Sequence, residues 1–373
     1  MQFRDLKKQY EAIKDDIDKA VSSVINDSNF ILGSQVKELE DKLASYVGRK
    51  HCVTCANGTD AIVLALMVMG IEKNDAVFVP DFTYIASASS ISFVGATPIF
   101  VDIDLDTFNI SPKSLETAIE KVKSEGKYNP KAIIPVDLFG LPANYDEISK
   151  IAKKYNLKII EDAAQGFGGK INNKLACSFG DISCTSFFPA KPLGCYGDGG
   201  AIFTDDDSVK DMLLSLRSNG KSPVDKYDNI MIGMNSRLDT LQAAILLQKF
   251  KVFVDYELEA VNKVYSWYNE LLKDKFKTPK IPEGYYSSFA QYTILCKNEE
   301  ERDSLKDKLK SNNIPSMVYY PRGMHEQKCF KDLDKISLDY KNSIEATKRV
   351  LSLPMHPYLT KEDVETVCKV ILN

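Results

Sequence analysis

Short apolar runs rich in β-branched residues alternate with stretches of helical periodicity between residues 51 and 205. The predicted strands are His51–Cys55, Ala76–Val79, Pro98–Asp102, Ala132–Val136, Lys158–Glu161, Ile182–Phe187 and Ala201–Phe203. Helical patterns fall between them, for example at Asp60–Met69 and Tyr145–Tyr155. Because strands that alternate with helices usually pair in parallel through right-handed crossovers, this pattern predicts an α/β fold. We expect a mixed, mostly parallel sheet with helices on both faces.

Helical periodicity also marks both sides of this region. Before it, the pattern predicts helices over residues 11–25 and Val36–Tyr46. After it, a long helical pattern over Leu238–Leu272 can bridge two domains. A smaller unit follows, with strands and helices expected at Gln291–Cys296, Glu301–Asn312, Ser316–Tyr320 and Lys361–Leu372. We therefore predict a large domain over residues 1–249, whose first 25 or so residues pack on the small domain, and a small α+β domain over 250–373.

The composition narrows the classes of partner. Hydrophobic residues make up 44% of the 373 residues, which rules out disorder as the main state. The 48 Lys and Arg against 52 Asp and Glu residues give a net charge of −4, which argues against nucleic acid or an anionic membrane as the main partner. The longest apolar run, Ala61–Met69, is shorter than the roughly 18 residues that span a bilayer. Since Met1–Lys8 also lacks an apolar signal core, we expect a cytoplasmic protein.

The cysteines and histidines do not have the spacing of a metal site. Cys52 and Cys55 are not followed by a second pair of soft ligands, so we interpret them as the end of a buried strand. The eight cysteines are expected to be reduced and mostly buried. Among the three histidines, His51, His325 and His356, no pair has ligand spacing, so no metal is predicted. His356 is interpreted as structural, and His325 as lying either near a substrate or on the plain surface.

A small, flexible turn follows the strand at 51–55. It reads Asn57-Gly58-Thr59, and a helix begins at once. The unpaired N–H groups and the dipole at a helix N-terminus attract an anion, and Gly58 lets the backbone approach closely, so the turn suits one phosphate. It lacks the Lys-Ser/Thr ending of a P-loop. Ordinary helix capping remains the alternative.

A carboxylate ends the strand at 158–161. In open α/β sheets, ligands lie at the carboxyl ends of the strands, where Asp162 is expected. A carboxylate there can hold a protonated ring nitrogen and keep a heteroaromatic ring electron-poor. Gln165, one turn further on, could reach a neighbouring ring substituent. The alternative for Asp162 is an ordinary helix N-cap.

A lysine stands between two prolines after the next strand. Lys191, in Phe188-Pro189-Ala190-Lys191-Pro192, has only apolar and small neighbours. Such surroundings should lower its pKa and make its amine nucleophilic, as a Schiff base requires. The alternative is an exposed loop lysine. Together, however, the phosphate turn, Asp162 and Lys191 follow three strands of one sheet and fit pyridoxal 5′-phosphate (PLP).

With these motifs, the sequence resembles the DegT/DnrJ/StrS group of nucleotide-sugar aminotransferases over essentially the whole chain. The most specific motifs are Ala56-Asn57-Gly58-Thr59-Asp60-Ala61, Glu161-Asp162-Ala163-Ala164-Gln165, Thr185-Ser186-Phe187-Phe188-Pro189-Ala190-Lys191 and Asn235-Ser236-Arg237-Leu238. The resemblance implies the PLP-dependent transferase type I fold of aspartate aminotransferase. It also implies a homodimer whose active site lies at the subunit interface.

The resemblance further implies roles for individual residues. Lys191 is the Schiff-base lysine and moves the proton between Cα and C4′ of the cofactor, and Asp162 pairs with the pyridine nitrogen. Either Tyr84 or Phe82 stacks on the ring, and Gln165 lies near the phenolic oxygen. The residues expected around the phosphate are Asn57, Gly58, Thr59, Ser186 and the partner subunit's Asn235. The residues expected to face the sugar nucleotide are Arg237, Tyr319, Tyr320 and His325.

Two stretches resemble the branch that acts on UDP-linked 3-keto-N-acetylhexosamines or their uronic acids. They are residues 184–200 and 235–246. The implied reaction produces the 3-amino sugar with L-glutamate as amino donor, for bacterial surface polysaccharide, lipid A or glycan synthesis. Where many relatives carry His-Tyr-Pro, this chain has Tyr319-Tyr320-Pro321, and Arg322 follows, so the group at C6 of the sugar stays open.

Three other functions remain as alternatives. They are an aminotransferase for a dTDP- or UDP-linked 4-keto-6-deoxy sugar, a non-catalytic PLP-binding regulator, and a sugar dehydratase of the same fold. Such dehydratases replace the Schiff-base lysine with histidine, so Lys191 argues against that function. A DNA-binding regulator would need a basic segment or helix-turn-helix beyond the enzyme core.

Overall fold

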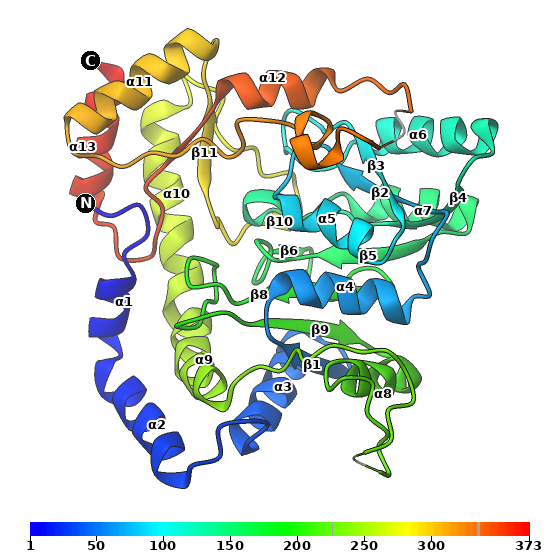
Figure 1. Cartoon of the computed structure of the whole chain (residues 1–373). Helices are drawn as coiled ribbons and strands as arrows, with labels where there is room; N and C mark the ends of the chain where they lie inside the picture. Colours follow the sequence, from blue (N-terminus) through cyan, green and yellow to red (C-terminus); the bar gives the residue numbers. More distant parts are fainter. Residues whose placement is uncertain (226, 334–335) are drawn as a thin grey trace.

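A seven-stranded sheet forms the centre of the computed structural model, which describes residues 1–225, 227–333 and 336–373 (Figure 1). The strand order is β1-β9-β8-β5-β4-β2-β3. In chain order these strands are β1 (His51–Cys55), β2 (Asp75–Pro80), β3 (Thr97–Val101), β4 (Asn129–Ile133), β5 (Lys158–Asp162), β8 (Ile182–Ser186) and β9 (Gly200–Thr204). All seven predicted strands are therefore present, with β4 beginning three residues earlier than expected.

Only β9 runs against its neighbours in this sheet. It pairs antiparallel with β8 and with β1, whereas β2, β3, β4, β5 and β8 pair in parallel. The predicted mixed, mostly parallel sheet is thus confirmed. Because β1 and β8 both run opposite to β9, the carboxyl ends of all six remaining strands lie along the same edge of the sheet. The loops that follow these strands are where ligands bind in such folds.

Helices cover both faces of the sheet, as the alternating pattern predicts. One face packs against α4 (Gly58–Val68), α5 (Ile85–Phe93) and α8 (Asp207–Leu216). The other face packs against α3 (Ser34–Val47), α6 (Pro112–Glu125), α7 (Tyr145–Tyr155) and α9 (Thr240–Val252). The strands are buried on both sides, which explains their continuous apolar runs.

A small unit is built on the long helix that follows the sheet. This helix comprises α9, a π-helical turn at Phe253–Glu257 and α10 (Leu258–Leu272). Its α10 end shares a separate hydrophobic cluster with the C-terminal elements (Figure 1). Those elements are β11 (Tyr292–Leu295), α11 (Glu299–Ser311), β12 (Val350–Leu353) and α13 (Lys361–Leu372), whereas α12 (Lys341–Arg349) packs through Ala346 in a different cluster. A third, small sheet joins β10 (Tyr285–Tyr286), β6 (Lys170–Ile171) and β7 (Lys174–Leu175).

The predicted strand at 316–320 is wrong. Only Met317 pairs there, through a single bridge to Ser352, and the partner of β11 is β12, which the pattern did not reveal. Prolines flank the segment at 315 and 321, and a proline lacks the N–H that a continuing ladder needs.

The N-terminal helices lie along the outside of α9. They are α1 (Leu6–Ala12) and α2 (Lys14–Asp27), and Ile13 and Ile17 pack against Ile245 of α9. The backbone N–H of Met355, in the small unit, donates to Phe3 O at 3.1 Å. The first residues thus contact the small unit while α2 packs on the large one. The domain boundary at 249/250 stays a prediction.

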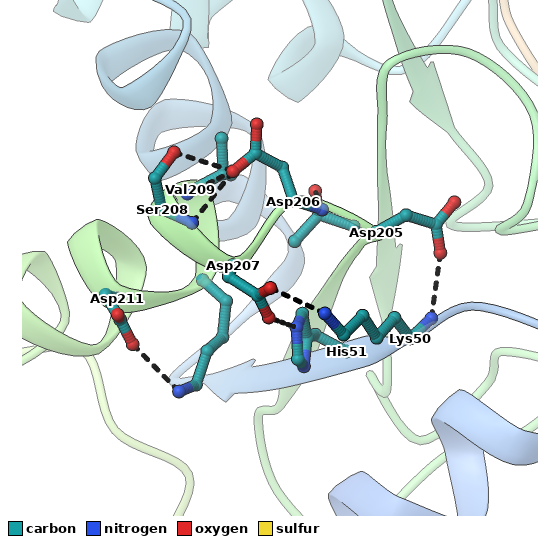
Figure 2. A network of polar contacts seen from close by, with 10 residues as sticks. Lys50, His51, Asp205, Asp206, Asp207, Ser208, Val209 and Asp211 are labelled. Atoms are coloured by element: carbon teal, nitrogen blue, oxygen red, sulfur yellow. Dashed lines mark hydrogen bonds and ion pairs between the residues drawn. The ribbon is translucent and has the colours of Figure 1, made fainter.

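A surface network of charged residues lies at the opposite end of β1 from the loop that follows it. Lys50 and His51 contact Asp205 and Asp207 at the start of α8, with His51 Nε2 at 2.7 Å from Asp207 Oδ1 (Figure 2). No group of three or more His, Cys, Asp or Glu side chains arranged to hold a metal ion occurs within residues 1–225, 227–333 and 336–373. The network joins β1 to α8.

The Cys52-x-x-Cys55 spacing belongs to strand β1, as interpreted from the sequence. Both thiols are buried, and their side chains join different hydrophobic clusters on the two faces of the sheet. Burial raises the pKa of the Cys55 thiol to about 12, and it raises that of Cys52 as well. Across the part of the chain that the structure describes, no helix is both long and apolar enough to cross a membrane.

Candidate active site

Four loops at the carboxyl edge of the sheet contribute the predicted site residues. They follow β1, β2, β5 and β8, which are neighbours or near neighbours in the strand order. Residues far apart in the sequence therefore meet at this edge, as the analysis of the motifs predicted. The position agrees with the general location of ligands in open α/β sheets.

The turn after β1 forms the N-terminus of α4. Asn57 is its N-cap, because its side-chain oxygen accepts from Asp60 N at 2.8 Å. Gly58 begins the helix against the end of β8, where a Cβ on Gly58 would lie 2.6 Å from the Cβ of Ser186. A side chain at position 58 would therefore collide with the strand. This brings Gly58, Thr59 and Ser186 together, all half-buried, as a phosphate site requires.

A neighbouring serine fixes this turn. Ser236 Oγ donates to Asp60 Oδ2 at 2.6 Å and accepts from Ala56 N at 3.1 Å. The side chains on either side of Ser236 are different, since Asn235 is exposed and its Oδ1 accepts from Arg237 Nη2 at 2.7 Å. Asn235 and Arg237 thus pair with each other at the surface. Sequence reasoning did not single out Ser236, although it stands inside the quoted Asn235-Ser236-Arg237 motif.

Asp162 ends β5 as a buried carboxylate, only 4% exposed. Its Oδ2 accepts from Ser87 Oγ at 2.7 Å and its Oδ1 from Ala164 N at 3.1 Å. Burial raises the pKa of Asp162, while these two hydrogen bonds and the charge of Lys191 oppose the rise. Sequence reasoning missed Ser87. The signal was its place in the first turn of α5, directly after the loop that follows β2.

Lys191 lies in the loop between β8 and β9. The loop is held by backbone bonds from Phe187 N to Gly199 O at 2.7 Å and from Lys191 N to Phe188 O at 2.9 Å. The side chain is half-buried. Desolvation by burial lowers the pKa of Lys191; the Asp162 carboxylate opposes this effect, and the Arg4 guanidinium adds to it. The two predicted catalytic groups therefore act on each other's charge across one site.

Gln165 connects the β5 loop with the segment around residue 320. Its Oε1 accepts from Phe139 N at 2.8 Å, and its Nε2 donates to Tyr320 Oη at 3.0 Å. Burial raises the pKa of Tyr320, so the phenol stays protonated. Two predicted site residues, Gln165 and Tyr320, thus contact each other directly. Among the described residues, Tyr320 Oη is the acceptor of Gln165 Nε2, and no acceptor is seen for its second hydrogen.

The two candidates for stacking on the ring differ in exposure. Phe82 is fully buried and packs against Phe108 and Phe139, so its ring is enclosed in the protein. Tyr84 is 55% exposed at the N-cap of α5, and its ring centroid lies 6.4 Å from that of Tyr320. Of the two, only Tyr84 presents a free ring face. The alternative that the sequence left open therefore narrows to Tyr84.

His325 is held by a buried carboxylate rather than open to solvent on all sides. Its Nδ1 lies 2.8 Å from Asp81 Oδ2, its backbone N–H donates to Asp81 Oδ1 at 2.8 Å, and its ring stacks on Tyr340. Asp81 is fully buried at the start of the loop that carries Tyr84. His325 thus hydrogen-bonds to, and stabilises, the loop after β2 that carries Tyr84. Tyr319, the remaining predicted substrate residue, packs edge-on against the ring of Phe3.

The assembled groups fit the chemistry of PLP. A half-buried anion-binding turn, a buried carboxylate and a lysine with a lowered pKa meet at one edge of the sheet, and one exposed aromatic ring lies beside them. Each group matches one part of the cofactor: the phosphate, the ring nitrogen, the aldehyde and the ring face.

Comparisons with known proteins agree with this geometry. The sequence model of the DegT/DnrJ/EryC1/StrS aminotransferase family matches residues 11–372. A "UDP-2-acetamido-2-deoxy-3-oxo-D-glucuronate aminotransferase" of Pseudomonas aeruginosa is 43% identical, covering 100% of both chains. A "pleiotropic regulatory protein" of Geobacillus stearothermophilus is 42% identical (98% of this chain, 96% of that one). A "UDP-N-acetyl-3-dehydro-alpha-D-glucosamine 3-aminotransferase" of Acidithiobacillus ferrooxidans is 39% identical, with the same coverage.

Solved structures show the same similarity in three dimensions. A DegT DnrJ EryC1 StrS aminotransferase from Brucella abortus is 47% identical, with a TM-score of 0.96 over 100% of this chain and 98% of that one. The Bacillus subtilis protein NtdA, solved with bound cofactor PMP, is 28% identical, with a TM-score of 0.85 over 97% of this chain and 82% of that one. The predicted type I fold is thereby confirmed.

Proposed function

Because this chain belongs to the DegT/DnrJ/EryC1/StrS aminotransferase family, we propose that it transfers an amino group to C3 of a UDP-linked 3-keto-N-acetylhexosamine or of its uronic acid. The chain is a PLP-dependent aminotransferase. The chemistry rests on one observation above all: at the carboxyl edge of the sheet, Lys191 lies near enough to the buried Asp162 for each charge to shift the pKa of the other group. The substrate class rests on the two relatives named for UDP-linked 3-keto sugars.

Two side chains would do the proton chemistry. When bound, PLP supplies an aldehyde that accepts the amino group and an electron-poor ring that takes up the electron pair of a cleaved Cα–H bond. Asp162 holds a proton on the ring nitrogen, and Ser87 and Ala164 fix the direction of its carboxylate. Lys191, with its lowered pKa, moves a proton between the substrate carbon and the cofactor carbon C4′.

The remaining residues would bind and orient. Gly58, Thr59 and Ser186 hold the phosphate at the N-terminus of α4, where Asn57 caps the helix. Tyr84 covers one face of the ring. Gln165 presents its free amide hydrogen to the oxygen on the ring. These are assignments that substitution can test one by one.

A homodimer would complete the site. Asn235 is exposed, and on the same segment Ile230 and Ile232 are 55% and 89% exposed. Exposed apolar side chains that gather on one segment can form the kind of patch that marks a protein–protein contact. We infer that a second copy covers this segment, so that the partner's Asn235 reaches the phosphate and Arg237 the sugar nucleotide. The enzyme would act in the cytoplasm, with L-glutamate as the amino donor and surface polysaccharide as the destination of the amino sugar.

The segment 319–325 would meet the sugar. Tyr320 is fixed by Gln165 and His325 by Asp81, so both are placed before any substrate arrives. Arg322 is exposed between them and can pair with a C6 carboxylate or with the pyrophosphate. The relatives are named for both the uronate and the neutral sugar, so the C6 group is the question for experiment.

A single-turnover assay tests the substrate class. The aminated enzyme is mixed with UDP-linked 3-keto and 4-keto hexosamines, each with and without a C6 carboxylate, and the return of the PLP absorbance is followed. We expect rapid turnover of the 3-keto series only. Preference for the 4-keto series would refute the proposal and favour the 4-keto-6-deoxy alternative. Removal of Arg322 (Arg322→Gln) should slow the uronate alone if the arginine pairs with C6.

A non-catalytic regulator is the second candidate, because one relative carries a regulatory name. Lys191 and Asp162 both argue against a site that has lost its reactivity. The absorbance of the purified protein with L-glutamate separates the two functions. Conversion of the PLP band to the PMP band supports the enzyme, and an unchanged PLP band would support the regulator.

A further inference from the structure

The N-terminal segment of the chain lies against the loop that carries Lys191. One terminal nitrogen of Arg4, Nη2, donates to the carbonyl oxygen of Lys191 at 2.8 Å and to that of Pro192 at 3.3 Å. These residues are separated by 187 and 188 positions in the sequence. The Arg4 side chain, near the start of the chain, therefore hydrogen-bonds to the backbone of Lys191, the proposed catalytic residue.

The segment that carries Arg4 is itself anchored. Phe3 O accepts from Met355 N at 3.1 Å, and the Phe3 ring packs edge-on against Tyr319 at 6.1 Å between centroids. On the other side, Asp5 caps α1 by accepting from Lys8 N at 2.9 Å. Arg4 thus extends from a backbone fixed on both sides. Because the backbone at Arg4 is already ordered, the contact with the loop costs only the conformational entropy of the arginine side chain.

Arg4 brings a permanent positive charge to a half-buried position. Burial lowers its pKa, and Glu257 and Tyr358 oppose this effect. Glu257 is itself held by Gln9 Nε2 at 2.7 Å and by Tyr358 Oη at 2.8 Å. The Glu257 carboxylate therefore partly balances the charge of the guanidinium.

The charge of Arg4 also affects the pKa of two further titratable groups. Burial lowers the pKa of Lys249 and lowers that of His356 to about 4, and the charge of Arg4 adds to both effects, so His356 is neutral at neutral pH. On the site side, Asp162 and Arg4 are the two charges that act on Lys191, with opposite signs. Arg4 thus belongs to the electrostatic surroundings of the catalytic amine as well as to its backbone support.

We propose that Arg4 is a positioning residue for the transamination: its guanidinium fixes the backbone of residues 191 and 192 and so aims the Lys191 amine at the side of the site where Asp162 lies. This inference rests on the proposed role of Lys191 and adds a residue to which the family motifs assign no role. Loss of the contact frees the loop, and a displacement of about 1 Å at a reacting group can cost as much as 100-fold in rate.

Two substitutions separate the charge of Arg4 from its hydrogen bonds. Arg4→Gln removes the positive charge and keeps a single donor group. Arg4→Lys keeps the charge, but an ammonium lacks the planar, preorganised donor geometry of the guanidinium. Lys8→Gln is the matched control, because Lys8 is an exposed basic residue in α1 of the same N-terminal segment.

Two measurements are made on each full-length variant. The first is kcat and KM for the complete transamination. The second is the pH dependence of Lys191 acetylation by acetic anhydride in the cofactor-free chain, read by peptide mass spectrometry, which does not depend on activity. Circular dichroism confirms that each variant is folded, and Arg4→Lys decides the question if Arg4→Gln does not fold.

For Arg4→Gln we expect kcat to fall about tenfold or more, with a smaller change in KM. Its acetylation midpoint should move up by about half to one pH unit, because a nearby cation no longer disfavours the protonated amine. Arg4→Lys should keep the midpoint near that of the wild type and still lose kcat. Lys8→Gln should change neither. Wild-type kcat in both Arg4 variants would overturn the proposal, whereas a midpoint shift without any transaminase activity in the wild type would refute only the proposed function.

Discussion

Two lysines of this chain lie among apolar residues, and burial lowers the pKa of both. Lys249, on α9, is 1% exposed, and burial lowers its pKa from 10.5 to about 8. Its Nζ lies 4.7 Å from the centroid of the Tyr196 ring and forms no hydrogen bond within the described parts of the chain. Lys191 is half-buried and therefore more exposed than Lys249, and its surroundings differ from those of Lys249.

The difference between the two lies in where each amine can reach. Lys191 stands on a loop at the carboxyl edge of the sheet and shares the site with Asp162. Lys249 is buried on α9, and its amine lies over the ring of Tyr196, which packs with Ile13 and Ile17 of the N-terminal region. A lowered pKa therefore does not by itself identify a catalytic lysine. Access to the ligand edge of the sheet, opposite a carboxylate, is what distinguishes Lys191.

Of the substitutions that test this difference, the replacement of Lys191 should have the largest effect on turnover. In Lys191→Ala we expect turnover to fall by about 10²–10⁴-fold or more, because no other group moves the proton. The absorbance band of lysine-bound PLP should also disappear, while circular dichroism stays unchanged because the side chain is only half-buried. Wild-type turnover in this variant would remove Lys191 from the mechanism.

Replacing the carboxylate opposite Lys191 comes next. Asp162→Asn keeps the shape but cannot hold a proton on the ring nitrogen as a charge pair, so we expect a loss on the order of 100-fold in kcat. Asp181→Asn is the control. Asp181 accepts from Ile159 N at the opposite end of β8, far from the ligand edge. Equal losses in both variants, measured as kcat, would show that the effect is structural.

The sequence located the seven strands of the large sheet, and it singled out the phosphate turn, Asp162 and Lys191, because each depends on local signals. β1 and α7 have the bounds that their apolar periods predict, and Lys191 and Asp162 follow strands of one sheet. Lys249, by contrast, has Gln248 and Lys251 close by in the chain, so its burial is visible only in the folded structure. Distinguishing the two required the three-dimensional path of α9.

Contacts between distant segments could not be predicted. Arg4 meets residue 191 in a chain whose first residues also bond to Met355, and Ser87 meets Asp162 because the first turn of α5 comes to the end of β5. The expected strand at 316–320 failed because pairing depends on the partner β12. Likewise, only packing showed that Phe82 is enclosed and Tyr84 is open.

The support of Asp162 offers a smaller, sharper test. Ser87→Ala removes the 2.7 Å hydrogen bond to Oδ2 and should raise the pKa of Asp162 further, because that bond lowers it. We expect kcat to fall by about three- to tenfold, which corresponds to roughly 0.6–1.4 kcal/mol, the net contribution of one ordinary hydrogen bond. Ser92→Ala, exposed on the same helix, should leave kcat unchanged. Equal kcat in the two variants would remove Ser87 from the support of the site.

Lys249 should give the smallest effect on activity and a clear effect on stability. Its pKa is lower in the folded chain than in the unfolded one, so the unfolded state binds the extra proton between about pH 8 and 10.5. The destabilisation of the folded chain by the buried, charged amine is fully present below pH 8 and fades toward pH 10.5. The free energy of unfolding contributed by Lys249 therefore rises with pH across that window.

Lys249→Met removes this titration while filling a similar volume. We expect the variant to be more stable than the wild type by about 1–3 kcal/mol at pH 7, with the difference shrinking toward pH 10, as measured by urea denaturation at both pH values. Turnover should stay within about threefold, because the amine is enclosed away from the ligand edge. A loss of turnover comparable to that of Lys191→Ala would contradict the distinction between the two lysines, since burial would then have sufficed to mark both as catalytic.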